Sequence, residues 1–182
     1  ALIAKVPEQP ACFCSQSTLY MNTDTQNLSA HTCHHIFPAR KRLISSYPNA
    51  SSADDARIDL ARCSISDGDF ERAGKLLDES VANSTSAASM DEISFLQGET
   101  RFLRGMFSEA QPFYKKIAES FPESRFVNDA LERLLFIMDT SGADSILVQS
   151  YMAAVREKSA GHYREAADLF QGMSLTMSET PL

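Results

Sequence analysis

The sequence predicts an all-α protein built from stacked pairs of antiparallel helices. Helical hydrophobic periodicity covers most of the chain after about residue 36. Six small or apolar residues also recur 37 positions later: Ala61, Gly68, Phe70, Ala73, Leu77 and Ser80 correspond to Gly98, Gly105, Phe107, Ala110, Tyr114 and Ile117. The junction YPNASSADDAR, from Tyr47, likewise resembles FPESRFVNDAL, from Phe121. Because one helix pair has too little apolar surface to be stable alone, this repetition indicates pairs that pack on one another.

Composition and charge narrow the class of protein. The chain has 182 residues, of which 43% are hydrophobic and 23% are charged, as is typical of a globular domain. No apolar run approaches the roughly 20 residues that a membrane-spanning helix requires. The net charge is −7, and the acidic residues are concentrated after residue 50. An acidic body argues against nucleic acid as a partner, because phosphates require a basic face.

The first 34 residues are predicted to be an irregular leader, because prolines and a polar tract interrupt any period. This leader and the residue after it hold a group of possible metal ligands: Cys12, Cys14, His31, Cys33, His34 and His35. Zinc selects thiolates and imidazoles, but their spacing here lacks the C-x2-C pairs of common zinc modules. The spacing therefore favours unpaired thiols over a metal site, and no cofactor is predicted. A Cys12–Cys33 or Cys14–Cys33 disulfide is the alternative in an oxidising compartment.

Helical repeats are expected to fill residues 35–182. Residues 36–50 read as the second helix of an incomplete unit, ended by Pro48. Its basic run, Arg40 to Arg42, reads as a solvated helix face rather than a site for an acidic partner. Residues 53–84 form a full helix pair that turns at Gly68. Within that pair, Cys63 is interpreted as a small buried apolar residue rather than a reactive thiol.

Residues 91–124 form the best-defined unit, with helices predicted at 92–104 and 108–120. Gly98 and Ala110 are small enough to let these two helices cross closely, and Pro122 ends the second helix.

Residues 125–175 are expected to form an irregular unit with an additional helix. It contains helices at about 125–140 and 144–159 and a last helix that opens after Gly161. The final SETPL aligns with PESRF from Pro122, so we expect a fragment of a longer array whose open end could support self-association.

These units resemble tetratricopeptide repeats, with the pattern W-x2-L-G-x2-Y…A-x3-F…P, over about residues 36–182. The match rests on small residues at the two helix crossings and on the terminal prolines: Ala61, Gly98 and Ala154; Ala73, Ala110 and Ala166; Pro48 and Pro122. The early Trp is absent and Arg101 replaces the usual Tyr, so individual units diverge. The YPN…ADDA and FPES…NDA junctions resemble those of bacterial cell-envelope repeat proteins, such as the outer-membrane assembly lipoprotein.

The resemblance implies a right-handed superhelix whose first helices line a concave groove for a peptide or protein segment. Carried over to this chain, the groove-facing positions are Asp55, Ile58, Arg62, Glu92, Phe95, Glu99, Phe102, Val148, Tyr151 and Val155. The alternative for each is packing against a neighbouring helix, and for Phe95 and Phe102 this alternative has at least equal weight. The family's Lys/Asn clamp for a C-terminal carboxylate is missing, because Ile58 and Arg62 occupy two of its positions.

The predicted function is therefore a noncatalytic protein-interaction scaffold, with the bacterial periplasm or envelope favoured over the cytoplasm. No nucleotide-binding, zinc-protease or serine-hydrolase motif is present, so the sequence does not predict an enzyme. His162 reads as a loop residue. The alternative function is a metal- or redox-responsive protein that uses Cys12, Cys14, Cys33 and His34.

Overall fold

The computed structural model describes residues 30–83, 89–141 and 145–179, and all of these belong to helices or to the turns between them. The helices are α1 (Ala30–Ser46), α2 (Ser51–Ser66), α3 (Phe70–Asn83), α4 (Met90–Phe102), α5 (Phe107–Ser120), α6 (Val127–Asp139), α7 (Ser145–Ser159) and α8 (Tyr163–Glu179). The prediction of an all-α, tetratricopeptide-like chain is confirmed. None of the described helices is both long enough and apolar enough to cross a membrane.

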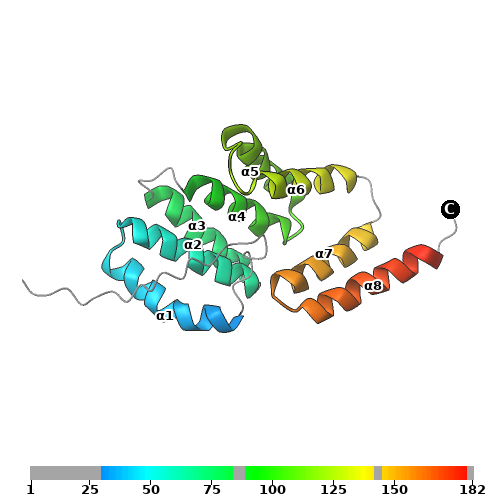
Figure 1. Ribbon diagram of the computed structural model, residues 1–182, viewed down its shortest axis with the longest axis horizontal. Helices are drawn as coiled ribbons and strands as arrows, with labels where there is room; N and C mark the ends of the chain where they lie inside the picture. The colour runs from blue at the N-terminus through cyan, green and yellow to red at the C-terminus, as the bar shows by residue number, and fades with distance from the viewer. Residues whose placement is uncertain (1–29, 84–88, 142–144, 180–182) are drawn as a thin grey trace, which may run out of the picture.

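Neighbouring helices pack in antiparallel pairs, as Figure 1 shows. The closest packed pairs are α2 with α3, α4 with α5, and α7 with α8, and α1 lies against α2. α4 occupies the middle of the molecule, and α7 and α8 form a pair at the opposite end from α1 (Figure 1). The arrangement is that of a short α-solenoid.

Three turns with the same backbone geometry join these pairs. Gly68, Gly105 and Gly161 have φ angles of 75°, 79° and 82°, a conformation that glycine adopts without steric cost. The N–H after each glycine donates to a carbonyl five residues earlier, as in the bond from Met106 to Arg101 at 3.0 Å. This is the Schellman helix ending, and its recurrence explains why glycine repeats at these positions in the sequence.

The contact between α4 and α5 depends on Gly98. A Cβ atom added to Gly98 would lie 2.7 Å from Cε1 of Tyr114, closer than real carbon atoms approach. Tyr114 and Ala110 are both fully buried, so the ring has no room to move away. The predicted close crossing at Gly98 and Ala110 is confirmed.

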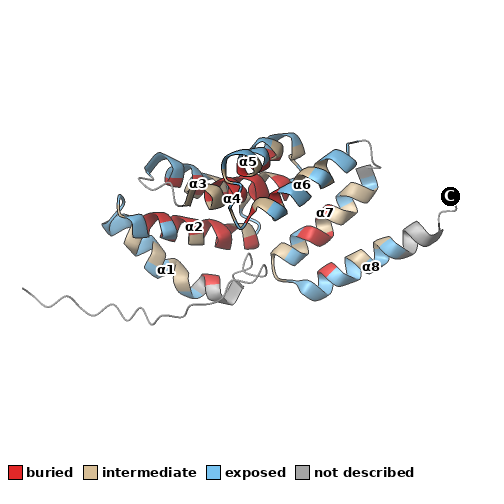
Figure 2. Cartoon of the chain, turned by 45° about the horizontal axis from the view of Figure 1, so that its top comes forward, coloured by how far each residue is buried: buried red, intermediate tan, exposed pale blue. Residues whose placement is uncertain are grey.

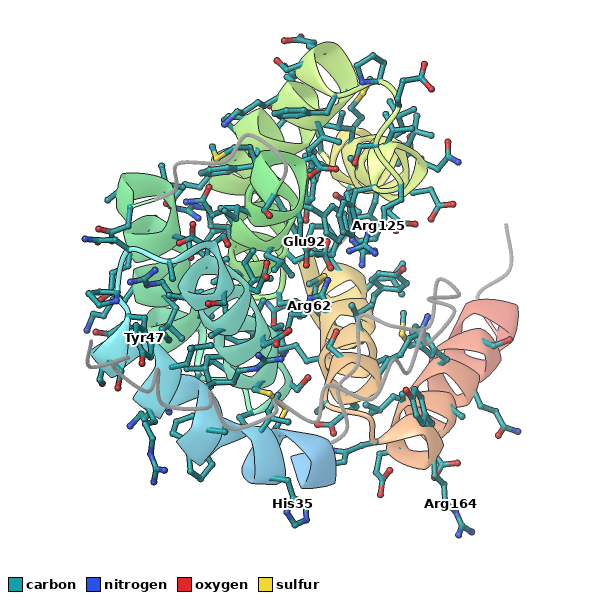
Figure 3. All side chains as sticks on the ribbon, turned by 60° about the vertical axis from the view of Figure 1, so that its left-hand side comes forward. His35, Tyr47, Arg62, Glu92, Arg125 and Arg164 are labelled. Atoms are coloured by element: carbon teal, nitrogen blue, oxygen red, sulfur yellow. A yellow bond between two sulfur atoms is a disulfide. The ribbon has the colours of Figure 1, made fainter. Side chains whose placement is uncertain are left out.

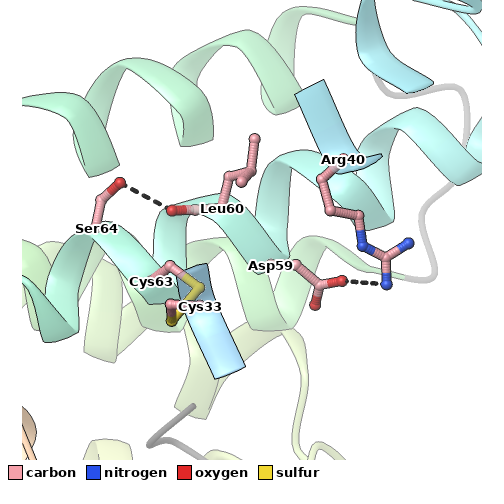
Figure 4. The surroundings of a disulfide bond; sticks show 6 residues. All are labelled: Cys33, Arg40, Asp59, Leu60, Cys63 and Ser64. Atoms are coloured by element: carbon pink, nitrogen blue, oxygen red, sulfur yellow. Dashed lines mark hydrogen bonds and ion pairs between the residues drawn. A yellow bond between two sulfur atoms is a disulfide. The ribbon is translucent and has the colours of Figure 1, made fainter. Parts of the chain in front are cut away.

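The disulfide observed in the structure joins Cys33 of α1 to Cys63 of α2, with the two Cα atoms 5.4 Å apart (Figure 4). This corrects the predicted partners of Cys33: Cys12 and Cys14 lie outside the described residues. It also corrects the reading of Cys63, which is 1% exposed but is bonded rather than a lone buried thiol. Residues 30 apart in sequence come together because α1 and α2 run antiparallel.

α1 begins at Ala30, so the last five residues of the predicted leader are helical. The helix continues through Pro38, whose ring removes one helical hydrogen bond. The disulfide at Cys33 joins the turn before this proline to α2. The sequence signal missed this start because the polar tract before Ile36 shows no helical period.

Polar side chains attach the rest of α1 to α2. Arg40 of α1 and Asp59 of α2 form an ion pair at 2.6 Å (Figure 4). Arg57 is buried, with 3% of its surface exposed, and donates to the Pro48 carbonyl at 2.8 Å and to Asp54 at 3.0 Å. Most of the other described α1 side chains are partly or fully exposed, so the disulfide is central to its attachment.

Aromatic rings carry the packing from α4 to the last helix pair. Phe136 of α6 lies edge-on to Phe102 of α4 and stacks on Tyr151 of α7, with ring centroids 4.8 Å apart in the stack. Tyr151 in turn meets Phe170 of α8. Figure 2 shows that burial is densest in α4 and its neighbours and thins toward α8.

Replacing Gly98 with Ala is expected to destabilise the chain by about 1–3 kcal/mol, because the added methyl group overlaps the Tyr114 ring. Gly74, inside α3, is the matched control because its added Cβ would meet nothing within 4 Å. Gly74→Ala should stabilise by about 0.5–1 kcal/mol, since alanine is the better helix former. Urea unfolding followed by circular dichroism measures both. Equal effects of the two substitutions would contradict the close crossing.

Removing the disulfide, by Cys33→Ser with Cys63→Ser, is expected to lower the free energy of unfolding by about 2–4 kcal/mol, because the open chain gains entropy. Reducing the wild-type chain should give the same loss and should have no further effect on the double variant. Peptide mapping under non-reducing conditions should recover Cys33 and Cys63 in one cross-linked peptide. A mapped pair that joins Cys33 to Cys12 or Cys14 would contradict this assignment.

Candidate partner-binding surface

α4 is enclosed on all sides. Every residue from Ile93 to Thr100 is buried, including the polar side chains of Gln97 and Glu99. A helix buried all round and carrying charge must satisfy that charge through neighbouring helices. The residues that pair with Glu99 and Glu92 of α4 therefore show which of these two acids is enclosed and which lies near the surface.

Glu99 is held by α5 and α6. The Tyr114 hydroxyl donates to its Oε1 at 2.7 Å, and Arg133 donates from Nε to Oε1 at 2.8 Å and from Nη2 to Oε2 at 3.1 Å. Burial alone would lower the pKa of Arg133, but the neighbouring Glu99 carboxylate outweighs burial and raises that pKa. Burial, and then Glu99, raises the pKa of Tyr114 well above its usual value. Arg133 thus remains charged and Tyr114 remains neutral.

A second set of charges crosses three elements nearer the surface; we call it the charged band, and it consists of Arg62, Glu92 and Arg125. Arg62 of α2 contacts Oε1 of Glu92 at the start of α4, and Arg125, just before α6, donates to Oε2 of Glu92 at 3.0 Å. Figure 3 shows the three labelled side chains together. Their side chains are 9%, 18% and 49% exposed, so the band opens toward Arg125.

The apolar positions predicted to face a groove are mostly part of the core. Phe95 and Phe102 are at most 1% exposed, and the remaining buried ones are Ile58 and Val155. Val148 and Tyr151 are partly buried against the same core. For Phe95 and Phe102 the packing alternative is therefore the observed arrangement, because α5, α6 and α7 close over α4.

The polar positions of the predicted groove have different surroundings. Asp55 is exposed, Glu92 is partly exposed, and Arg62 and Glu99 are buried in ion pairs. The structure brings Arg62 and Glu92 together and leaves Asp55 on the open side of α2. Whether these residues bind a partner stays a prediction.

Sequence reasoning missed Arg125 and Arg133. Each bonds an acid 33 or 34 residues earlier, Glu92 and Glu99 respectively, which is close to one repeat length. An acid on one helix followed by an arginine one repeat later is thus the signal that could have identified both.

The predicted group of metal ligands loses one member, because the sulfur of Cys33 is bonded to Cys63. Cys12 and Cys14 lie outside the described residues, as do the side chains of His31 and His34. His35 is exposed on α1. Within the described parts of the chain, no three His, Cys, Asp or Glu side chains are placed to hold a metal ion.

A cleft of about 330 Å³ lies where the α2–α3 turn approaches the α7–α8 turn. Its polar lining includes Asp67, Arg156 and His162. Arg156 donates to the Leu103 carbonyl at 3.3 Å, and His162 contacts Glu157 at 2.8 Å. His162 lies at an exposed turn, as the sequence predicted, and charges of both signs line this cleft.

The raised pKa of Tyr114 predicts a late phenol titration. The native state favours the neutral phenol of Tyr114, and this preference stabilises the fold. The stabilisation is complete below the unfolded pKa of about 10, and it is lost as pH rises through the higher pKa of the folded state. Of the five tyrosines, one should form phenolate only when the chain unfolds at alkaline pH. Near-ultraviolet absorbance against pH measures this, and Tyr114→Phe should remove the late step. A wild-type titration without that step would contradict the burial of Tyr114.

The sequence matches a family model described as outer membrane lipoprotein, YfiO, over residues 14–157. No curated protein matches the chain. The matched segment covers α1 to α6 and nearly all of α7, including the charged band and the Glu99 network. By sequence and by its helical-repeat fold, the chain belongs to the YfiO family of bacterial outer membrane lipoproteins.

Proposed function

We propose that the chain is a noncatalytic scaffold that binds a segment of another protein during assembly of the bacterial envelope. Two facts support this role: the chain belongs to an outer membrane lipoprotein family, and its helices are arranged as a repeat array. Arrays of this kind bind partners along the face where successive helices lie side by side. In this chain we assign that face to α2, the start of α4 and the turn before α6, which the charged band connects.

The charged band is the observation that carries the proposal. It connects α2, α4 and the α5–α6 turn, and its most exposed side chain is Arg125 at 49%. The Arg125 guanidinium also lies 4.6 Å from the centre of the Phe126 ring, which orients it. Arg125 already donates to Glu92 at 3.0 Å, and the exposed half of its side chain would still attract a carboxylate of a partner.

The proposed partner segment is therefore acidic or mixed in charge where it meets Arg125. Phe95 and Phe102 are buried and cannot contact a partner, which favours a charged segment over one held mainly by apolar side chains. Asp55, exposed on α2, gives the same face a negative side chain that would pair with a basic residue of the segment. Opposite charges at two points would fix the direction in which the segment lies.

The disulfide supports the periplasmic side of the envelope as the working compartment. Disulfides form and persist in the oxidising periplasm and are rare in the bacterial cytoplasm. Cys33 and Cys63 are at most 3% exposed, which is typical of a structural disulfide rather than a labile one.

Arg125→Glu is expected to lower recovery of the bound partner about tenfold or more, because it reverses the charge at the proposed contact. Lys75→Glu is the matched control: it makes the same change in net charge at an exposed site on α3, whose side chain is 71% exposed. Affinity purification from envelope extracts with quantitative mass spectrometry measures recovery. The free energy of unfolding of both variants is measured alongside, because Arg125→Glu also removes the ion pair with Glu92.

The same purification can contradict the proposal. If Arg125→Glu and Lys75→Glu recover the same proteins in the same amounts, the charged band is not the binding surface. A second purification with Asp55→Lys checks the opposite end of that face, and it should also reduce recovery.

A further inference from the structure

α6 presents an unusual outer face. Leu131, Leu135 and Met138 are 45%, 59% and 65% exposed. Their spacing of four and three residues puts them on one side of the helix, and we call them the α6 stripe. The opposite side of α6 faces the body: Ala130 is fully buried and Arg133 bonds to Glu99. The fold therefore does not require the α6 stripe, and the stripe is separate from the charged band.

Three large apolar side chains in successive turns form a contiguous exposed patch about 10 Å long. Single exposed apolar residues are normal, whereas contiguous patches mark interaction sites. Figure 2 shows the exposed side of α6 at the rim of the molecule. Among the described residues, the other large exposed apolar side chains are spread over the turn after α1 and over α3, α7 and α8, at Tyr47, Val81, Ile146, Tyr163 and Leu169.

Acidic side chains border one edge of the α6 stripe. Glu132 and Asp139 are exposed and directly follow Leu131 and Met138, so both lie on the same edge. Burial, and then the nearby Glu132 carboxylate, raises the pKa of Asp129, which is consistent with local negative potential. The one basic residue of α6, Arg133, is turned toward Glu99.

We propose that the α6 stripe docks an amphipathic helix of a partner protein that carries Lys or Arg along one edge. Apolar side chains at helical spacing on the partner would cover Leu131, Leu135 and Met138. Its basic edge would lie against Glu132 and Asp139, which adds attraction and fixes orientation.

The same charges disfavour other occupants. A second copy of the chain would bring a second acidic edge against the first, which disfavours self-association through this face. An anionic lipid surface would be repelled by Glu132 and Asp139. A basic helix is the occupant that both the apolar and the acidic parts of the surface favour.

The test uses the full chain and two synthetic helical peptides with identical leucine positions, one with lysines and the other with glutamates along one edge. Fluorescence anisotropy at low salt should show binding of the lysine peptide about tenfold or more tighter than the glutamate peptide. Leu135→Gln should weaken lysine-peptide binding about tenfold or more. Leu169→Gln, at a 41% exposed site on α8, is the matched control and should leave binding unchanged.

Charge reversal tests the acidic edge separately. Glu132→Lys with Asp139→Lys should reverse the preference, so that the glutamate peptide binds more tightly. All these sites are exposed, so the variants should unfold at the same urea concentration as the wild type within error. Equal binding of both peptides, or equal effects of Leu135→Gln and Leu169→Gln, would overturn the proposal. A dimer in sedimentation equilibrium that Leu135→Gln abolishes would also overturn it, in favour of a second copy.

Discussion

The close approach of α4 to the ring of Tyr114 at Gly98 is the constraint on which the rest of the structure depends. The missing side chain at Gly98 lets α5 approach α4 until the Tyr114 hydroxyl reaches Glu99 at 2.7 Å. The same carboxylate then binds Arg133 of α6. One small residue thus sets how closely α5 approaches α4, because a bulkier one would push the Tyr114 ring away from Glu99.

Charged pairs, rather than apolar contacts alone, connect elements one repeat apart. Glu92 joins α2 to the start of α6, and Glu99 joins α4 to α6. Buried charges are costly unless they are paired, and breaking one partner leaves an uncompensated charge. Such pairs therefore favour one register between successive helices over its alternatives. A fixed register gives the array a constant surface, which is what the proposed scaffold role requires.

Local chemistry explains which parts of the fold were predictable. The turn glycines at 68, 105 and 161 and the small residues at the helix crossing each satisfy a requirement visible in a short stretch of sequence. The Cys33–Cys63 bond was not predictable, because the pairing depends on how α1 lies against α2. The helical start at Ala30 was missed because the polar tract before Ile36 shows no helical period.

The candidate site was less predictable than the fold. The curvature of the array decides whether Phe95 and Phe102 face a groove or the next helix, and periodicity carries no information about curvature. Both rings lie in the core, so the open part of that face consists of charged residues such as Glu92 and Arg125. The spacing of about one repeat between Glu92 and Arg125, and between Glu99 and Arg133, is the part of this arrangement that the sequence does indicate.

Hydrogen exchange of the full chain, followed by mass spectrometry, tests the central position of α4 most directly. Amides exchange slowly where they open only with global unfolding. The amides of Ile93–Thr100 should be the slowest in the chain, with those of α8 and the N-terminal turn of α1 much faster. Exchange in α4 as fast as in α8 would contradict an array organised around the Gly98 crossing.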